Sequence, residues 1–193
     1  QPDPLTPLDE TMQALDDLVT QGKIRYIGCS NLPSWQVVES QWLSKSMGLN
    51  RFVSCQDEYN ILNRDVETEL IPAMQKYGCG LLPYFPLASG LLTGKYKRTE
   101  MPAGARLTDM PTFANRIYLT DENFDLVDKL NKFANKTGHS ILELAFGWMA
   151  SRPTTASIIA GATKPEQIDA NVAAANWVLS QSEIDEVDTI SAR

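Results

Sequence analysis

Apolar positions recur along this chain in two patterns that alternate. Longer segments carry an apolar residue at every third or fourth position, as at Leu8, Met12 and Leu15, which is typical of a helix with one buried face. Short apolar runs rich in strand-forming residues lie between these segments. The pattern predicts helices over residues 7–21, 35–46, 65–77, 121–137, 140–150, 165–175 and 181–190. It predicts strands over residues 23–29, 52–56, 81–84 and 155–160, and a long loop over residues 86–120.

Strands that alternate with helices indicate a parallel sheet with helical crossovers. Polar residues follow these strands directly: Ser30 and Asn31 after the first, Gln56 after the second, and the turn at residues 161–163 after the fourth. Open α/β sheets and (β/α)8 barrels both place their sites at the carboxyl ends of the strands. Ser30 and Asn31 suit a carboxamide ligand or a helix cap, and Gln56 suits an amide ligand or solvent.

The stretch of residues 79–96 combines a strand, an aromatic ring and a glycine-bearing loop. The strand ends at Tyr84, because Pro86 cannot donate to a sheet ladder. The loop then runs through a Ser-Gly pair and a Thr-Gly pair to Lys95. A ring, free backbone amides and a cation suit a ligand with a flat heterocycle and phosphates, although an ordinary strand and loop would look similar. Likewise, the turn at 161–167 either points helix amides at an anion or is a plain connection.

Composition narrows the function classes. The 193 residues carry a net charge of -7, which argues against a nucleic-acid partner, and no apolar run approaches the ~20 residues of a membrane helix. The chain has three cysteines, which we interpret as reduced thiols of a cytoplasmic protein. His139 is the only histidine and no CxxC spacing occurs, so we expect no metal site. The sequence contains no GxGxxG fingerprint, so it gives no support for a Rossmann fold.

Four segments together carry a family resemblance. Residues 24–31 (IRYIGCSN), 53–60 (VSCQDEYN), 84–96 (YFPLASGLLTGKY) and 161–171 (GATKPEQIDAN) resemble, in order and spacing, the aldo-keto reductase superfamily. The match runs the whole length of the chain. The resemblance implies a (β/α)8 TIM barrel that transfers hydride from a nicotinamide dinucleotide, usually NADPH, to an aldehyde or ketone.

The resemblance also implies cofactor-binding roles for particular residues. Ser30, Asn31 and Gln56 match the positions that hold the nicotinamide carboxamide, and Tyr84 matches the aromatic residue that stacks on its ring. The loop over the pyrophosphate is matched by Leu87, Ser89, Lys95 and Arg106, and Phe85 stands at the cofactor-site position directly after the stacking aromatic residue. The adenosine and 2′-phosphate site is matched by Gly161, Thr163, Lys164, Gln167 and Asn171.

Three departures from the family pattern are visible. Phe85 stands where serine is usual, and Ala170 stands where glutamate is frequent. The family's catalytic Asp, Tyr, Lys and His lie on the first half of the barrel, so no catalytic residue is assigned here. The chain opens at Gln1 with a helix rather than a strand. We therefore expect residues 1–193 to be the C-terminal part of one barrel domain, strands five to eight.

These departures define the expected activity and partners. The complete protein is expected to reduce a small carbonyl substrate with NADP as cofactor, whereas the chain alone is expected to be inactive. The missing first half of the barrel, or self-association, is expected to complete the fold. The alternatives are a non-enzymatic nucleotide-binding subunit and an inactive fragment.

Overall fold

The computed structural model describes residues 2–109 and 117–192. These residues form two compact units. Unit 1 comprises Gln1–Glu58, Asp65–Tyr84 and Thr154–Ser157, and unit 2 comprises Tyr59–Arg64, Phe85–Pro153 and Ile158–Arg193. Residues 110–116, which fall in the expected loop 86–120, lie outside the described residues, as do Gln1 and Arg193.

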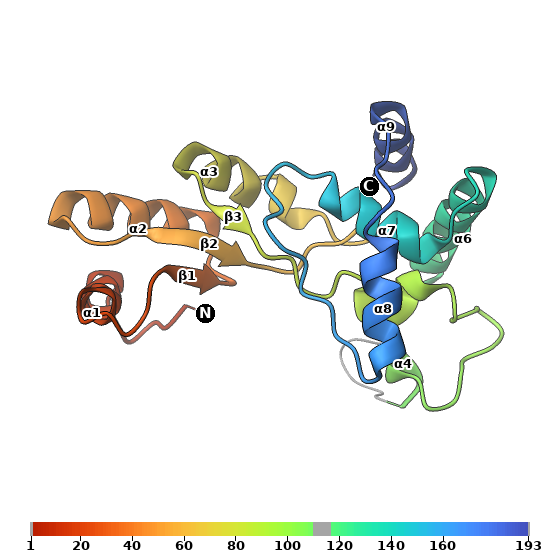
Figure 1. The fold of residues 1–193 in the computed structure, drawn as a ribbon, viewed down its shortest axis with the longest axis horizontal. Helices are drawn as coiled ribbons and strands as arrows, with labels where there is room; N and C mark the ends of the chain where they lie inside the picture. Colours follow the sequence, from red (N-terminus) through yellow and green to blue (C-terminus); the bar gives the residue numbers. More distant parts are fainter. Residues whose placement is uncertain (1, 110–116, 193) are drawn as a thin grey trace. The chain divides into compact units, whose positions relative to one another are not determined.

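Unit 1 is built on a three-stranded parallel sheet in the order β1-β2-β3 (Figure 1). Its strands are β1 (Ile27–Ser30), β2 (Phe52–Gln56) and β3 (Gly80–Leu81), and its helices are α1 (Leu8–Thr20), α2 (Ser34–Met47), the 3-10 turn η1 (Asp65–Glu67) and α3 (Leu70–Tyr77). In register, Cys29 lies opposite Cys55 and Ser30 lies opposite Gln56. The expected α/β class with parallel strands and helical crossovers is confirmed. The barrel and its second half remain predictions.

The first strand is shorter than expected because its leading residues complete the end of α1. The backbone N–H groups of Gly22 and Lys23 donate to Val19 O and Leu18 O at 2.9 and 3.0 Å. Amides used in this way cannot pair with β2, so the ladder begins only at Ile27.

The prediction of a fourth strand over residues 155–160 is wrong, because these residues form no regular strand. Thr155 forms only an isolated bridge with Leu81, supported by the bonds from Leu81 N to Thr154 O and from Ala156 N to Leu81 O at 2.7 and 2.8 Å. The ladder stops because β3 itself is two residues long and Pro83 has no N–H to extend it.

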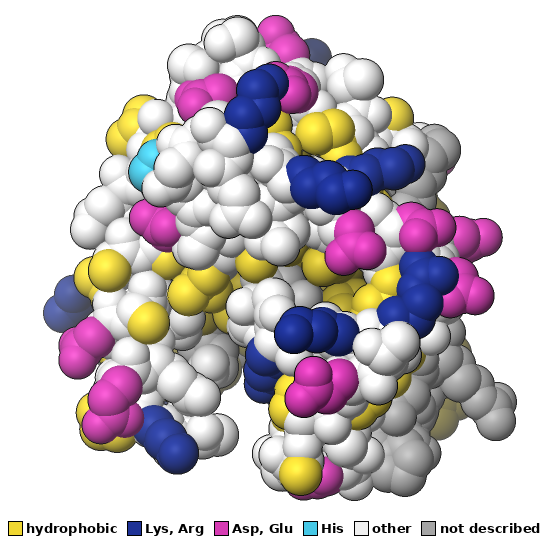
Figure 2. All heavy atoms as spheres, turned by 90° about the vertical axis from the view of Figure 1, so that its right-hand side faces the viewer, with side chains coloured by type: hydrophobic (Ala, Val, Ile, Leu, Met, Phe, Trp, Pro, Cys, Tyr) yellow, Lys and Arg dark blue, Asp and Glu magenta, His cyan; other side chains and the backbone are white. Residues whose placement is uncertain are grey.

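Unit 2 is mainly helical. It contains the 3-10 segment η2 (Ala88–Thr93), α4 (Arg106–Asp109), α6 (Asp121–Lys136), α7 (Ile141–Ala150), α8 (Pro165–Ala174) and α9 (Gln181–Ile190). Capping boxes start α7 at Ser140 with Glu143 and α9 at Ser180 with Glu183. The expected loop 86–120 therefore contains two short helical segments, η2 and α4. Exposed charges in this unit are mixed in sign, and Figure 2 shows basic side chains beside acidic ones on the face it draws.

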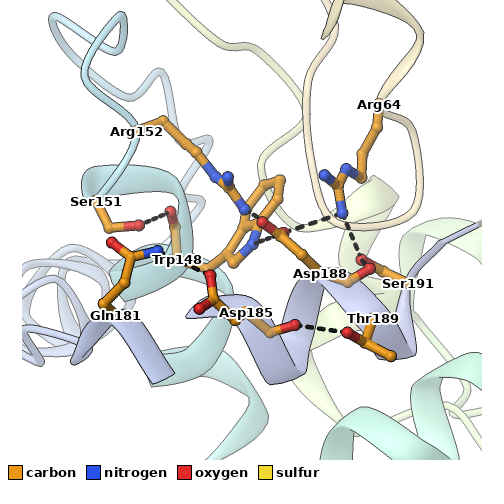
Figure 3. A network of polar contacts seen from close by, with 9 residues as sticks. All are labelled: Arg64, Trp148, Ser151, Arg152, Gln181, Asp185, Asp188, Thr189 and Ser191. Carbon is orange, nitrogen blue, oxygen red and sulfur yellow. Dashed lines mark hydrogen bonds and ion pairs between the residues drawn. The ribbon is translucent and has the colours of Figure 1, made fainter. Parts of the chain in front are cut away.

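A polar network joins α7, α9 and the segment Tyr59–Arg64 (Figure 3). The Asp188 carboxylate accepts from Trp148 Nε1 at 2.9 Å and pairs with Arg64 Nη1 at 3.0 Å and with Arg152. Arg152 also lies over the Trp148 ring, with its guanidinium carbon 4.0 Å from the ring centroid. One carboxylate thus balances two guanidinium groups beside a fully buried indole.

Candidate cofactor site

The carboxyl ends of β1 and β2 and the segment after β3 bring four expected site residues together in unit 1. Asn31 is the centre of this group: its Nδ2 donates to Ser30 Oγ at 2.9 Å, and its Oδ1 accepts from the Tyr84 hydroxyl at 2.8 Å. The backbone N–H of Asn31 donates to Gln56 O at 3.3 Å. All four side chains are half-buried, so they remain accessible to a ligand at the sheet edge.

Asn31 has a left-handed backbone with φ of 55°. This conformation is uncommon for a residue with a side chain, and asparagine tolerates it better than most. The bonds to Ser30, Gln56 and Tyr84 hold the strained residue in place. Backbone strain of this kind concentrates at binding sites, which supports a ligand role for Asn31 rather than a capping role alone. No Asn31 side-chain cap is formed on α2, whose N-cap residue is Pro33.

Asp57 is a residue of this site that the sequence reading missed. Its side chain is buried, and its carboxylate accepts the backbone N–H of Asn31. Burial raises the pKa of Asp57 to about 6, although the Asn31 hydrogen bond opposes this shift. Burial, together with the nearby Glu58 and Asp57, also raises the pKa of Tyr84. The only sequence signal was the position of Asp57 directly after Gln56, because burial cannot be read from one acidic residue in a polar run.

A groove of about 870 Å³ runs along unit 1 and reaches this group. Its lining includes Ser30 and Gln56 at the strand ends and Gly28, Cys29 and Ser54 behind them. Gly28 is required there, because a Cβ at this position would lie 2.4 Å from Ser54 Oγ. The strand ends therefore border open space wide enough for a ligand ring.

The residues expected over a pyrophosphate lie in unit 2, in η2 and in the segments on either side of it. Phe85, Ala88 and Ser89 all have positive φ, of 52°, 47° and 57°. The exposed Arg106 guanidinium lies 5.4 Å from the centroid of the Phe85 ring. Phe85, in the position where serine is usual, thus supplies a surface for this cation instead of a hydroxyl group.

Three further members of this expected set are less closely associated. Leu87 is half-buried, and its carbonyl accepts from Gly90 N at 2.8 Å, which closes the turn into η2. Ser89 is buried. Lys95 is exposed, with its Nζ 5.1 Å from the centroid of the Tyr96 ring. The structure therefore groups Phe85 with Arg106 and leaves Lys95 on the surface of the same loop.

The residues expected at the adenosine end gather at the start of α8 in unit 2. Gln167 Oε1 accepts from Thr163 N at 2.7 Å and from Thr163 Oγ1 at 3.2 Å. Lys164 is the exposed N-cap residue of α8, and its side chain makes no capping bond. An added Cβ at Gly161 would meet no atom within 4 Å, so the backbone there is open to a ligand. Asn171, half-buried, lies two turns further along α8.

Other classes of site find no support in the described part of the chain. Residues 2–109 and 117–192 contain no group of three or more His, Cys, Asp or Glu side chains placed so that they could hold a metal ion, and no helix within them is long and apolar enough to cross a bilayer. His139 stacks on Trp177 with ring centroids 3.8 Å apart and contacts Glu143 Oε1 through its Nδ1 at 3.2 Å. These contacts to Trp177 and Glu143 indicate a structural role for this histidine.

Comparison with known proteins gives the same family as the quoted motifs. The sequence model of the Aldo/keto reductase family matches residues 1–192. A probable voltage-gated potassium channel subunit beta from Oryza sativa subsp. japonica is 35% identical over 98% of this chain and 59% of that protein. The NADH-specific methylglyoxal reductase of Escherichia coli (strain K12) is 34% identical over 92% of this chain and 52% of its own length.

A third relative, the versiconal hemiacetal acetate reductase of Aspergillus parasiticus, is 31% identical over 93% of this chain and 52% of that protein. The chain thus spans a little over half the length of these relatives. The family match over almost every residue is decisive for classification: the chain belongs to the aldo/keto reductase family.

Proposed function

We propose that this chain supplies most of the cofactor site of an NADPH-dependent reductase that converts an aldehyde or ketone to an alcohol. The observation that supports the proposal most strongly is the group around Asn31. Three hydrogen bonds hold this residue, whose backbone is left-handed, at the edge of a parallel sheet. Family membership supports a nicotinamide cofactor in general.

In this proposal the strand ends of unit 1 bind and orient the nicotinamide. Ser30, Asn31 and Gln56 together offer hydroxyl and amide groups that both donate and accept, as a carboxamide ligand requires. The Tyr84 ring, tethered through its hydroxyl to Asn31, provides a flat surface in a fixed orientation. The bound cofactor supplies hydride to a carbonyl carbon. A fixed ring plane determines which face of the nicotinamide is turned to the substrate.

The phosphate-bearing end of the cofactor is assigned to the start of α8. The free backbone N–H groups of a helix N-terminus favour an anion, and Lys164 adds a full positive charge at the same place. Charge-assisted contacts are worth about 1.5–3 kcal/mol, so a 2′-phosphate should favour NADPH over NADH by roughly ten- to a hundredfold.

Equilibrium binding of both cofactors to the purified protein tests this assignment. Lys164→Ala should weaken NADPH binding by about tenfold and leave NADH binding unchanged. Lys132→Ala, an exposed lysine on α6, makes the same charge change away from α8 and is the matched control. Equal dissociation constants for NADPH and NADH in the unmodified protein would contradict the NADPH assignment.

The proton donor for reduction is proposed to come from outside these 193 residues. Among the described residues, β1 pairs only with β2, so its outer edge and the adjoining groove are open to another strand. We propose that this edge pairs with the other half of a barrel or with a second copy of the chain. The three free thiols suit a reducing compartment such as the cytoplasm.

Solution mass and NADPH oxidation with a reactive aldehyde test this part of the proposal. The chain alone should bind NADPH without oxidising it, and should be larger than a monomer or only partly folded. A folded monomer that reduces the aldehyde would overturn it.

A non-enzymatic nucleotide-binding subunit is the second candidate. It is favoured by two relatives, one from Oryza sativa subsp. japonica and one from Arabidopsis thaliana, each called a probable voltage-gated potassium channel subunit beta. The two candidates share the cofactor site and differ in turnover. Single-turnover oxidation of bound NADPH by a panel of aldehydes, measured on the complete protein, separates them.

A further inference from the structure

The three cysteines of the chain meet in one cluster in unit 1. Cys29 on β1 and Cys55 on β2 are register partners, and their sulfur atoms lie 3.5 Å apart. Cys79 directly precedes β3, and its thiol donates to Phe52 O at 3.3 Å. Two neighbouring strands thus place the thiols of Cys29 and Cys55 in contact, which the spacing of the cysteines along the chain does not reveal.

Cys79 makes its own contacts. The Gln41 amide points its Nε2 at the Cys79 sulfur, at 3.4 Å, and the Cys79 thiol donates to Phe52 O. The direct sulfur–sulfur contact of the cluster is the one between Cys29 and Cys55.

Access to the cluster is one-sided. Cys55 is fully buried and Cys79 is 6% exposed, whereas Cys29 is half-buried and lines the groove of about 870 Å³. In the chain by itself, before this groove receives another strand, a small oxidant such as a peroxide therefore reaches Cys29 before the other two thiols.

We propose that Cys29 and Cys55 form a reversible, peroxide-driven disulfide. The Cys29 sulfur attacks one peroxide oxygen, the O–O bond breaks, and one water leaves, which makes Cys29 a sulfenic acid. The Cys55 sulfur then attacks the Cys29 sulfur and breaks its S–O bond. The departing hydroxide takes the Cys55 thiol proton and becomes the second water. Two thiols are oxidised to a disulfide, and one peroxide is reduced to two waters.

The geometry suits this pair better than the alternatives. Register partners on adjacent strands have Cα atoms within the ~4.4–6.8 Å that a disulfide spans. The two sulfur atoms need to approach from 3.5 Å to about 2.05 Å, which is a side-chain movement. The cross-link would lie one residue before Ser30 and Gln56.

Peptide mapping of the purified protein after brief exposure to hydrogen peroxide tests the proposal. Trypsin places each cysteine on its own peptide, because cleavage at Lys and Arg yields residues 26–45, 52–64 and 77–95. We expect peptides 26–45 and 52–64 to be linked, at a mass two hydrogen atoms below their sum, with the link lost on reduction and Cys79 still open to alkylation. A link between 52–64 and 77–95, or full alkylation of all three thiols after peroxide, would overturn the proposal.

Single variants test the separate steps. Cys29→Ser should abolish the linked peptide, whereas Cys55→Ser should leave a sulfenic acid on Cys29 that a dicarbonyl trapping reagent labels. Cys79→Ser should form the same link at the unmodified rate and is the matched control. A Cys79→Ser variant that forms no link would contradict the assignment of the pair. These readouts do not depend on cofactor binding, so they stand apart from the proposed reductase function.

Discussion

Replacing Asp188 by asparagine tests the polar network of unit 2 (Figure 3). The substitution keeps the size of the side chain but removes the charge that balances Arg64 and Arg152. Breaking a fully buried pair costs about 3–5 kcal/mol, because an uncompensated charge remains. Here the side chains of Arg64, Arg152 and Asp188 are 22%, 18% and 29% exposed, and water screens part of the loss. We expect unit 2 to lose about 2 kcal/mol of unfolding free energy.

Hydrogen exchange followed by mass spectrometry measures this loss locally. The amides of α7 and α9 should exchange roughly 30-fold faster in Asp188→Asn, the factor that corresponds to about 2 kcal/mol. The matched control is Asp185→Asn on the same helix. Asp185 is exposed, and its carboxylate accepts from Gln181 Nε2 at 2.8 Å, a bond that asparagine can keep. The control should change stability by less than about 0.5 kcal/mol.

The pH dependence gives a second test of the same carboxylate. Burial acts to raise the pKa of Asp188, but hydrogen bonds from Arg152 and Trp148 and the charges of both arginines lower it overall. A lowered folded pKa adds stability above the unfolded value of about 3.9, and this stability is lost as pH falls through the folded value. The difference between Asp188→Asn and the unmodified protein should therefore shrink below about pH 4. Equal exchange rates in Asp188→Asn and Asp185→Asn at pH 7 would refute the reasoning.

Three further predictions concern unit 1. Tyr84→Ala should weaken NADPH binding by about 1 kcal/mol or more through the lost ring, whereas Tyr84→Phe keeps the ring and loses only the tether to Asn31; calorimetry that finds the two variants alike would remove the ring from the site. Gly28→Ala should destabilise unit 1 by about 1–3 kcal/mol in urea unfolding, because its Cβ would meet Ser54. Adding Ser54→Gly should recover part of this loss, and no recovery would contradict the steric cause. The raised pKa of Asp57, about 6, means that the folded state holds its proton more tightly than the unfolded chain, so stability from this group falls as pH rises from about 4 to 6. Asp57→Asn should flatten this part of the stability profile, and an unchanged profile would show that another group titrates there.

Local chemistry was readable from the amino-acid sequence alone. The helices followed from apolar spacing, and the capping boxes at Ser140 and Ser180 form because each needs only residues three positions apart. The carboxyl ends of parallel strands meet at one edge, so Ser30 and Gln56 could be expected to lie side by side, as they do. The family motifs follow the same local logic, since they sit in single turns or at strand ends.

Long-range contacts were decided only by the tertiary structure. The burial that shifts the pKa of Asp57, the sulfur contact between Cys29 and Cys55, and the balance of two arginines by Asp188 all depend on residues far apart in the chain. The segment 155–160 shows the same limit, since its apolar run favours a strand, but a ladder needs a partner with free N–H groups. Burial and pairing depend on which segments become neighbours, and a single sequence carries no direct record of that.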